Sequence, residues 1–310
     1  MSKLLTVFGA TGQQGGSLTD YVLKNNELSQ LYRIRAITRD ISKPSAIALK
    51  DRGVEVVQAD LDKPATLLKA LTGSYAVFGV TNYWERASKE GEVAQGKAIA
   101  DASVAAGVEL LIWSSLPSVT KLSKGKVALK HFDSKAEIED YVRSLPILSV
   151  FFMAGWYMQN HISHMRPQPV GDGTYKLSQT FAPTSTLPMI DITDTGKFIA
   201  PILLDPLKYQ GKSFTCATKL LTPLQLVEGW TRVTGKTVIY SMVDPENMVS
   251  EAMTPEMRAE LKKSAGLINE YRYFGPTGQA DMEWTQAQVK DVLTTWEEFV
   301  KANEPWFEQV

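Results

Sequence analysis

Residues 4–16 read Leu4-Leu5-Thr6-Val7-Phe8-Gly9-Ala10-Thr11-Gly12-Gln13-Gln14-Gly15-Gly16, an apolar, β-branched run that ends abruptly in glycines. The run favours a strand, and the residues after Gly16 suit a helix. In such a strand–turn–helix context, Gly9 permits the tight turn, Gly12 lets the backbone approach a pyrophosphate, and Gly15 lets the helix pack closely on the strand. The first amides of the helix then point at the anion. An ordinary surface turn is the alternative, which the alternation of strands and helices downstream disfavours.

Length and composition describe an ordinary globular chain. Its 310 residues can bury a sizeable core, and 44% of them are hydrophobic and 22% charged. Lys and Arg total 33 against 34 Asp and Glu, a balance without the broad basic footprint of direct nucleic-acid or membrane binding. The single cysteine, Cys216, excludes an intrachain disulfide and a multi-cysteine metal site. Without a signal peptide or membrane-spanning run, we expect a cytoplasmic protein, with the nucleus as a second compartment.

Residues 1–152 alternate strand-like and helical segments. Further strands are predicted over 33–38, 54–58, 75–80, 110–113 and 147–152, with helices over 45–52, 64–73 and 92–106 and around an apolar stripe at 138–145. This rhythm predicts an α/β fold, a Rossmann-type doubly wound parallel sheet. Right-handed crossovers then place the carboxyl ends of all these strands at one edge of the sheet. Sheets of this kind bind their ligands at that edge.

Residues 153–310 follow a different pattern, with prolines and glycines breaking the chain between about 167 and 188. We expect helices near 194–204 and from 222, strands near 213–217 and 237–240, a partly helical region over 245–275, and a final helix whose apolar stripe runs from Val289 to Val300. The region is interpreted as a smaller α+β C-terminal capping domain over the cofactor cleft, with some segments returning to the main sheet.

Two cations after the second predicted strand indicate which dinucleotide fits. A carboxylate at this point accepts from the adenosine ribose hydroxyl, whereas a cation suits a 2′-phosphate. Arg39 follows the strand and can make a two-pronged contact with phosphate, and Lys43 adds a point charge. Asp40 favours the NAD alternative but lies one position late, and a solvated basic turn is the structural alternative. We therefore predict NADP(H) as the cofactor.

The next two strand ends extend the predicted binding edge. Asp60 can accept from the adenine amino group while Leu61 packs nearby, although Asp60 could instead cap the helix that begins at Pro64. Thr81, Asn82 and Tyr83 leave the fourth predicted strand where the nicotinamide half should lie.

Five motifs together resemble the NmrA-like family. They are the glycine stretch, Thr38-Arg39, Val80-Thr81-Asn82-Tyr83-Trp84-Glu85, Gln95-Gly96-Lys97 and His131-Phe132-Asp133-Ser134-Lys135. The resemblance covers essentially the whole chain. It implies an atypical short-chain dehydrogenase/reductase fold that binds NADP(H), often without demonstrated turnover, and regulates protein partners. It also implies that Tyr157, Met158, Gln159 and Asn160 line the nicotinamide end.

Residues 131–135 correspond to the catalytic dyad of related dehydrogenases. Dehydrogenases of this broad fold use Tyr-x-x-x-Lys, in which tyrosine supplies a proton and lysine holds the nicotinamide ribose. Here Lys135 is present, but His131 replaces the tyrosine, and Ser114 or Ser115 could take the third catalytic position. A histidine can donate a proton near neutral pH, so a catalytic His131 stays open beside a cleft-lining or packing role. We assign no catalytic residue, and treat Lys135 as cofactor-binding.

The resulting prediction is an NADP(H)-binding regulatory protein that senses cofactor level or redox state through a protein partner. The alternative is an NADPH-dependent reductase of a quinone or other carbonyl compound, which would bind as a small-molecule ligand in the cleft. Self-association as a homodimer is compatible with either function. His161 and His164 share a helical spacing but have no carboxylate or cysteine nearby in sequence, so no metal site is predicted.

Overall fold

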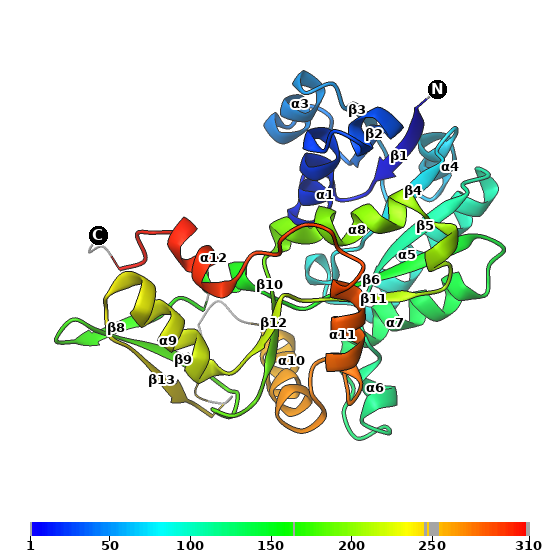
Figure 1. Cartoon of the computed structure of the whole chain (residues 1–310). Coiled ribbons are helices and arrows are strands. Elements are labelled where there is room, and N and C mark those ends of the chain that lie inside the picture. Colours follow the sequence, from blue (N-terminus) through cyan, green and yellow to red (C-terminus); the bar gives the residue numbers. More distant parts are fainter. Residues whose placement is uncertain (1, 164, 245–246, 248–253, 308–310) are drawn as a thin grey trace.

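The computed structural model describes residues 2–163, 165–244, 247 and 254–307 (Figure 1). Seven parallel strands form the main sheet in the order β11-β6-β5-β4-β1-β2-β3. The strands are β1 (Lys3–Val7), β2 (Tyr32–Thr38), β3 (Glu55–Gln58), β4 (Ala76–Gly79), β5 (Leu110–Ser115), β6 (Leu148–Ala154) and β11 (Ser213–Cys216). The prediction of a Rossmann-type doubly wound parallel sheet is confirmed.

Helices cover both faces of this sheet, which explains the continuous apolar runs of its strands. Neighbouring strand residues point to opposite faces: Phe78 and Phe152 belong to one core, and Val77 and Phe151 to the other. The first core is closed by α1 (Gln13–Lys24), α2 (Leu28–Leu31), α3 (Pro44–Asp51) and α8 (Thr195–Leu204), and the second by α4 (Ala65–Leu71), α5 (Lys89–Ala105) and α7 (Lys130–Arg143). The short α6 (Val119–Leu122) precedes α7.

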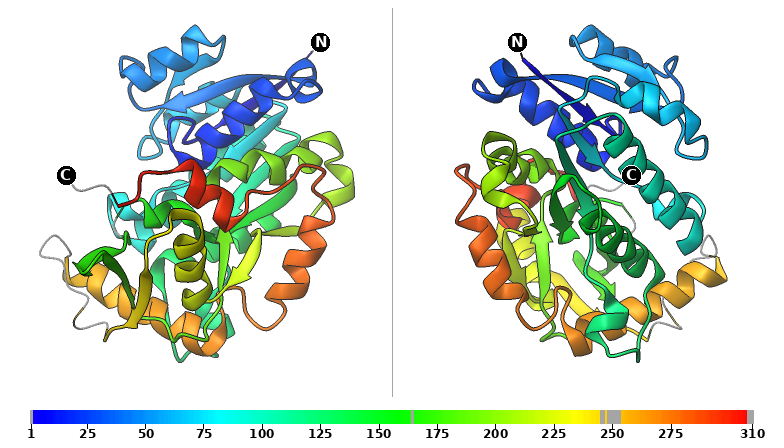
Figure 2. Two further views of the ribbon diagram at one scale, coloured as in Figure 1. Left: turned by 60° about the vertical axis from the view of Figure 1, so that its left-hand side comes forward. Right: turned by 90° about the vertical axis from the view of Figure 1, so that its right-hand side faces the viewer.

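A smaller mixed region carries its own core. Its strands form two three-stranded sheets, β12-β10-β7 and β13-β9-β8. Their bounds are β7 (Trp156–Tyr157), β8 (Gln168–Gly171), β9 (Thr174–Gln179), β10 (Leu187–Ile190), β12 (Lys219–Leu221) and β13 (Val238–Met242), and the helices are α9 (Pro223–Thr234), α10 (Pro255–Gly266) and α12 (Trp296–Ala302). α11 (Gly278–Gln286) instead packs against β11 of the main sheet, where the Thr285 hydroxyl accepts from the Thr215 amide at 2.9 Å. Figures 1 and 2 show this region at the end of the molecule away from β2 and β3.

Short helical turns join several of these elements. They are η1 (Tyr83–Glu85), η2 (Met158–His161), η3 (Ile192–Asp194), η4 (Leu207–Tyr209) and the π-helical η5 (Leu267–Tyr271). His161 is buried against the rings of Trp230 and Trp296, so it serves the core of the smaller region. His164 lies outside the described residues, and no group of metal-ligating side chains occurs among those described. Nor does any described helix have the length and apolar character needed to cross a bilayer.

β11 returns from the second half of the chain to the edge of the main sheet beside β6. Its Cys216 is fully buried, and burial raises the pKa of the thiol well above its ordinary value. Cys216 is therefore a small packing residue in the sheet.

The prediction of one helix from Val289 to Val300 is wrong over its first half. α12 begins only at Trp296, because the Thr295 side chain accepts from the Glu298 amide and the Glu298 side chain accepts from the Thr295 amide. This capping box starts a new helix, and Val292 before it is 82% exposed. Of the helical prediction over 245–275, residues 245, 246 and 248–253 lie outside the described residues.

Candidate functional site

A cavity of about 1070 Å³ runs along the carboxyl edge of the main sheet. It is lined by residues that follow β1 to β5 and, from the smaller region, by residues of β7, α10 and η5. Sixteen of the predicted site residues line it: Gly9, Thr11, Gly12, Gln13, Gln14, Gly15, Arg39, Lys43, Asp60, Leu61, Thr81, Asn82, Tyr83, Lys135, Tyr157 and Asn160. The topology therefore brings together positions as far apart in sequence as Gly9 and Asn160.

Three predicted site residues do not line this cavity. Ala10 is 2% exposed and Met158 is 1% exposed, and both belong to packed interiors. Gln159 turns away, donating from Nε2 to Asp191 Oδ1 at 2.7 Å and accepting from the Ile192 amide at 3.1 Å. A side-chain role for these three in ligand binding is therefore not supported by their positions.

The turn between β1 and α1 has the shape that a pyrophosphate requires. Gly9 adopts a φ of +62°, and the Gly12 amide donates to the Gly9 carbonyl at 2.8 Å. A Cβ on Gly15 would lie 2.4 Å from that same carbonyl oxygen, so no larger residue fits there. No described side chain caps the N-terminus of α1. Its first amides are thus available to an anion, and the turn fits a dinucleotide.

The adenosine end of the cavity is charged and exposed. Arg39, after β2, forms an ion pair with Glu85 of η1, and Arg86 forms another with Asp62, after β3. Asp40 turns back on its own loop, where it accepts from the Ser42 hydroxyl at 2.6 Å and from the Ser42 amide at 2.9 Å. These hydrogen bonds from Ser42 lower the pKa of the Asp40 carboxyl.

Asp60 and Lys43 also line the adenosine end. The Asp60 carboxylate accepts from the Asp62 amide at 3.1 Å, while α4 begins without a described side-chain cap. The alternative role of Asp60 as a helix cap is therefore not seen. Arg39 and Lys43, which follow β2, are the cations that an adenosine phosphate would use. Asp60, which follows β3, is the carboxylate that an adenine would use.

The nicotinamide end contains two hydrogen-bonded clusters. In the first, Gln14 accepts from the Ser114 hydroxyl at 2.7 Å and donates to the Tyr157 hydroxyl. Burial raises the pKa of Tyr157 above its ordinary value, so this phenol stays protonated at neutral pH. Gln14 thereby links the glycine turn to the ends of β5 and β7.

The second cluster surrounds Glu92, which is 3% exposed. Its carboxylate accepts from Lys135 Nζ at 2.7 Å, from the Thr81 hydroxyl at 2.7 Å and from the Ser134 hydroxyl. Lys135 Nζ also donates to the Thr81 carbonyl at 3.1 Å. The lysine that the sequence pattern assigns to cofactor binding is thus held by a buried counter-ion between β4, α5 and α7.

His131 lies one helical turn before Lys135 and contacts α10. Its Nδ1 is 3.0 Å from Glu260 Oε2, which also accepts from the Lys130 amide at 3.0 Å. Burial acts to raise the pKa of Glu260, but the hydrogen bonds from His131 and Lys130 and the charges of His131 and Lys263 outweigh it and lower that pKa. Glu260 therefore remains a carboxylate that orients the imidazole.

Beyond these clusters the cavity becomes apolar. The described residues that line this part are Leu116, Trp156, Met165, Leu267, Ile268 and Tyr273. Tyr273 donates its hydroxyl to the Ala154 carbonyl at 3.2 Å, and burial raises its pKa, so it acts as a neutral wall. The space beside the nicotinamide end thus suits an uncharged, flat or apolar molecule.

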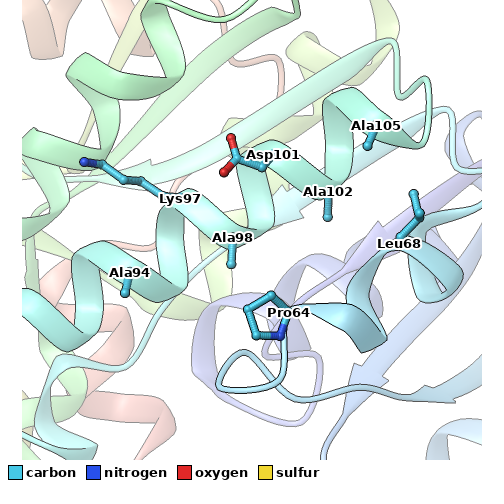
Figure 3. A pocket seen from close by; sticks show the side chains of 8 residues that line it. All are labelled: Pro64, Leu68, Ala94, Lys97, Ala98, Asp101, Ala102 and Ala105. Carbon is cyan, nitrogen blue, oxygen red and sulfur yellow. The ribbon is translucent and has the colours of Figure 1, made fainter.

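A second hollow, of about 410 Å³, lies between α4 and α5 (Figure 3). Alanines form most of the α5 side, and its two charged residues serve Tyr141: the Lys97 ammonium lies 5.1 Å from the ring centroid, and Asp101 accepts the hydroxyl at 2.5 Å. This hollow offers no cluster of reactive side chains comparable to that of the edge cavity.

Fold and site together define a Rossmann-type protein with a glycine turn at the carboxyl edge of its sheet. The chain belongs to the NmrA-like family, because a model of that family matches residues 1–300. An NmrA-like family domain-containing protein of Dictyostelium discoideum is 31% identical over 97% of this chain and 98% of its own length. The NmrA-like oxidoreductase cpsB of Aspergillus campestris is 32% identical over 92% of this chain and 89% of its own length.

Solved structures show the same fold. Nmra, described as a negative transcriptional regulator, has a TM-score of 0.85 at 24% identity over 99% of this chain and 96% of its own, and it has also been solved with NAD and with NADP. A triphenylmethane reductase of Citrobacter sp., solved with NADP(H), has a TM-score of 0.75 at 21% identity over 97% of this chain and 99% of its own.

The structure also adds residues to the site that the sequence argument had not assigned. Glu85 is the last residue of the motif Val80-Thr81-Asn82-Tyr83-Trp84-Glu85, so the sequence did point to its neighbourhood. Glu92 and Glu260 carry no such signal, because each becomes informative only through the cation or imidazole that it meets in space. The apolar wall of η5 and Tyr273 is likewise assembled by tertiary packing.

Proposed function

We propose that this protein binds NADP(H) along the edge cavity and acts as a regulatory protein that reports cofactor level or redox state to a protein partner. The observation that carries the proposal is the altered proton-donor dyad. His131 takes the place of tyrosine and is held by Glu260, while Lys135 is neutralised by Glu92. The description of Nmra as a transcriptional regulator, and its structures with NAD and NADP, support this proposal.

Each part of the cavity has a role in this proposal. The amides at the start of α1 would hold the pyrophosphate, and Arg39 with Lys43 would hold the 2′-phosphate. Asp60 and Leu61 would contact the adenine. Lys135, Tyr157 and the residues after β4 would surround the nicotinamide ribose and ring.

The test combines binding with turnover. Purified protein is titrated with NADPH and NADP⁺ by calorimetry, and NADPH oxidation is then followed by absorbance against a panel of quinones and other carbonyl compounds. We expect binding without sustained oxidation. Sustained turnover of any panel member would reject the purely regulatory function. A pull-down with and without NADPH, together with size-exclusion chromatography, then asks whether a partner or a second copy of the chain binds in a cofactor-dependent way.

The second candidate function is NADPH-dependent reduction of a quinone or other carbonyl compound. The apolar part of the cavity favours it, as do the related proteins that are named oxidoreductases. A bound reduced nicotinamide supplies a hydride. His131 would then hold a proton at Nε2, the nitrogen that does not face Glu260, and pass it to the developing alkoxide oxygen. Loss of turnover in His131→Gln with unchanged NADPH affinity would support this chemistry.

A further inference from the structure

The turn η1 lies between two ion pairs at the adenosine end. Glu85 reaches Arg39, which follows β2, and Arg86 reaches Asp62, which follows β3. Gln95 of α5 also donates to Asp62, at 2.9 Å. This short turn after β4 is therefore held by charged groups from the two neighbouring strand ends, at the place where an adenosine would bind.

The same turn makes ring contacts toward the other end of the cavity. The Trp84 ring centroid lies 4.9 Å from that of His131, and the Tyr83 centroid lies 5.7 Å from it. His131 in turn contacts Glu260 of α10. A continuous series of contacts thus leads from Arg39, through η1 and α7, to a helix of the smaller region.

The first contact in this series is the one that a ligand can exchange. The Arg39 and Glu85 side chains are 59% and 39% exposed, and ion pairs at such sites contribute little to stability. A phosphate offers the same guanidinium more charge and a two-pronged geometry. One guanidinium fork that grips a phosphate in this way has few donors left for the carboxylate, so the two anions compete.

We propose that Glu85 is a specificity-determining residue that competes with the 2′-phosphate of NADP(H) for Arg39, and that the exchange releases η1. The inference rests on the proposed binding of NADP(H) and adds the residue that couples the 2′-phosphate to the rest of the cavity. NAD(H) lacks this phosphate and leaves the pair between Arg39 and Glu85 in place. The aromatic contacts of η1 with His131 then respond to NADP(H) and not to NAD(H).

Glu85→Gln tests the competition, because it removes the charge and keeps the shape. Glu137→Gln is the matched control, since Glu137 is 44% exposed and its ion pair with Lys89, at 3.0 Å, joins α7 to the start of α5. We expect Glu85→Gln to raise NADP⁺ affinity by about two- to five-fold and to leave NAD⁺ affinity unchanged, measured by calorimetry at low salt. The control should change neither. An unchanged ratio of the two affinities, or a loss of NAD⁺ binding through a missing ribose contact, would overturn the proposal.

Hydrogen exchange tests the release of η1. In the wild type, saturating NADP⁺ should speed amide exchange over residues 83–87 and saturating NAD⁺ should not, whereas Glu85→Gln should show fast exchange without any dinucleotide. Equal exchange with both cofactors would overturn the coupling. If wild-type protein prefers NADP⁺ but Glu85→Gln behaves like wild type, only this inference fails; if wild-type protein binds neither dinucleotide, the proposed function itself fails.

Discussion

The two ends of the edge cavity hold their charges in opposite ways. At the adenosine end, Arg39 and Glu85 face solvent, and their ion pair contributes little free energy. At the nicotinamide end, the Glu92 and Lys135 side chains are 2% and 13% exposed, and further hydrogen bonds satisfy the carboxylate. Exposed pairs can be exchanged for a ligand at small cost, whereas a buried pair defines geometry and is costly to break. One end is thus built for exchange and the other for fixed positioning.

The largest effect on binding is expected in the glycine turn that joins the two ends. Gly15→Ala places a Cβ 2.4 Å from the Gly9 carbonyl oxygen, so the turn must open and dinucleotide binding should be lost. Gly16→Ala is the control, because a Cβ on Gly16 would lie 3.4 Å from its nearest neighbour, the Ala10 carbonyl oxygen, and alanine favours a helix. Calorimetric titration with NADP⁺ checks both variants. Retained affinity in Gly15→Ala would contradict a pyrophosphate site at this turn.

Breaking the buried pair should have the largest effect on stability. Glu92→Ala leaves the Lys135 ammonium without its counter-ion in a buried setting, and we expect the free energy of unfolding to fall by about 3–5 kcal/mol. Glu137→Ala removes an exposed pair and should cost less than about 1 kcal/mol. Urea denaturation of the wild type and of both variants measures the difference in the free energy of unfolding. Similar losses in the two variants would show that the buried pair at the nicotinamide end is no costlier to break than an exposed pair.

Loss of the Arg39 cation should change the preference for NADP(H) over NAD(H) without a comparable effect on the stability of the fold. Arg39→Ala should weaken NADP(H) binding by about 1.5–3 kcal/mol, roughly ten- to 150-fold, because a charge-assisted contact to the 2′-phosphate is removed. NAD(H) affinity and the urea midpoint should change little. Wild-type protein that binds both dinucleotides equally would reject the assignment of NADP(H).

At the nicotinamide end, Lys135 and His131 should separate binding from chemistry. Lys135→Ala should weaken dinucleotide binding, since the lysine is the part of the usual dyad that remains. His131→Ala should leave binding within about two-fold, because His131 contacts Glu260 and the rings of η1 and α7. Fluorescence titration with NADPH compares the two variants. Abolition of a robust wild-type reductase activity by His131→Ala would favour the second candidate function.

The smallest expected effect is a difference between the reduced and the oxidised cofactor. Both share the adenosine and phosphates, so discrimination must arise near Tyr83, Lys135 and Tyr157. Hydrogen exchange over residues 81–90 and 157–175 in apo, NADP⁺-bound and NADPH-bound protein measures it. Equal changes with both cofactors would leave a sensor of occupancy and reject sensing of the redox ratio. No change in either segment would remove this switching mechanism.

Local sequence determined the architecture of the sheet edge that carries the cavity. The glycine turn, the alternating strands and helices and the cations after β2 act over short distances, since backbone conformation and the burial of both sheet faces follow from neighbouring residues. A sheet of parallel strands then places their ends together whatever the details of packing. This is why the sequence could predict the parallel sheet and place Arg39 at the edge that now carries the cavity.

Only the tertiary structure decided the contacts that give each end its character. His131 meets Glu260 across 129 residues, and Lys135 meets Glu92 across 43. The apolar stripe at 289–300 looked helical, yet the Thr295 cap interrupts it and Val292 faces solvent. In the first two cases the deciding energy is the pairing of a side chain with a distant partner, and local propensity carries no record of that partner. The break at Thr295 has a local cause, since Glu298 lies only three residues further on, and the apolar period alone did not reveal it.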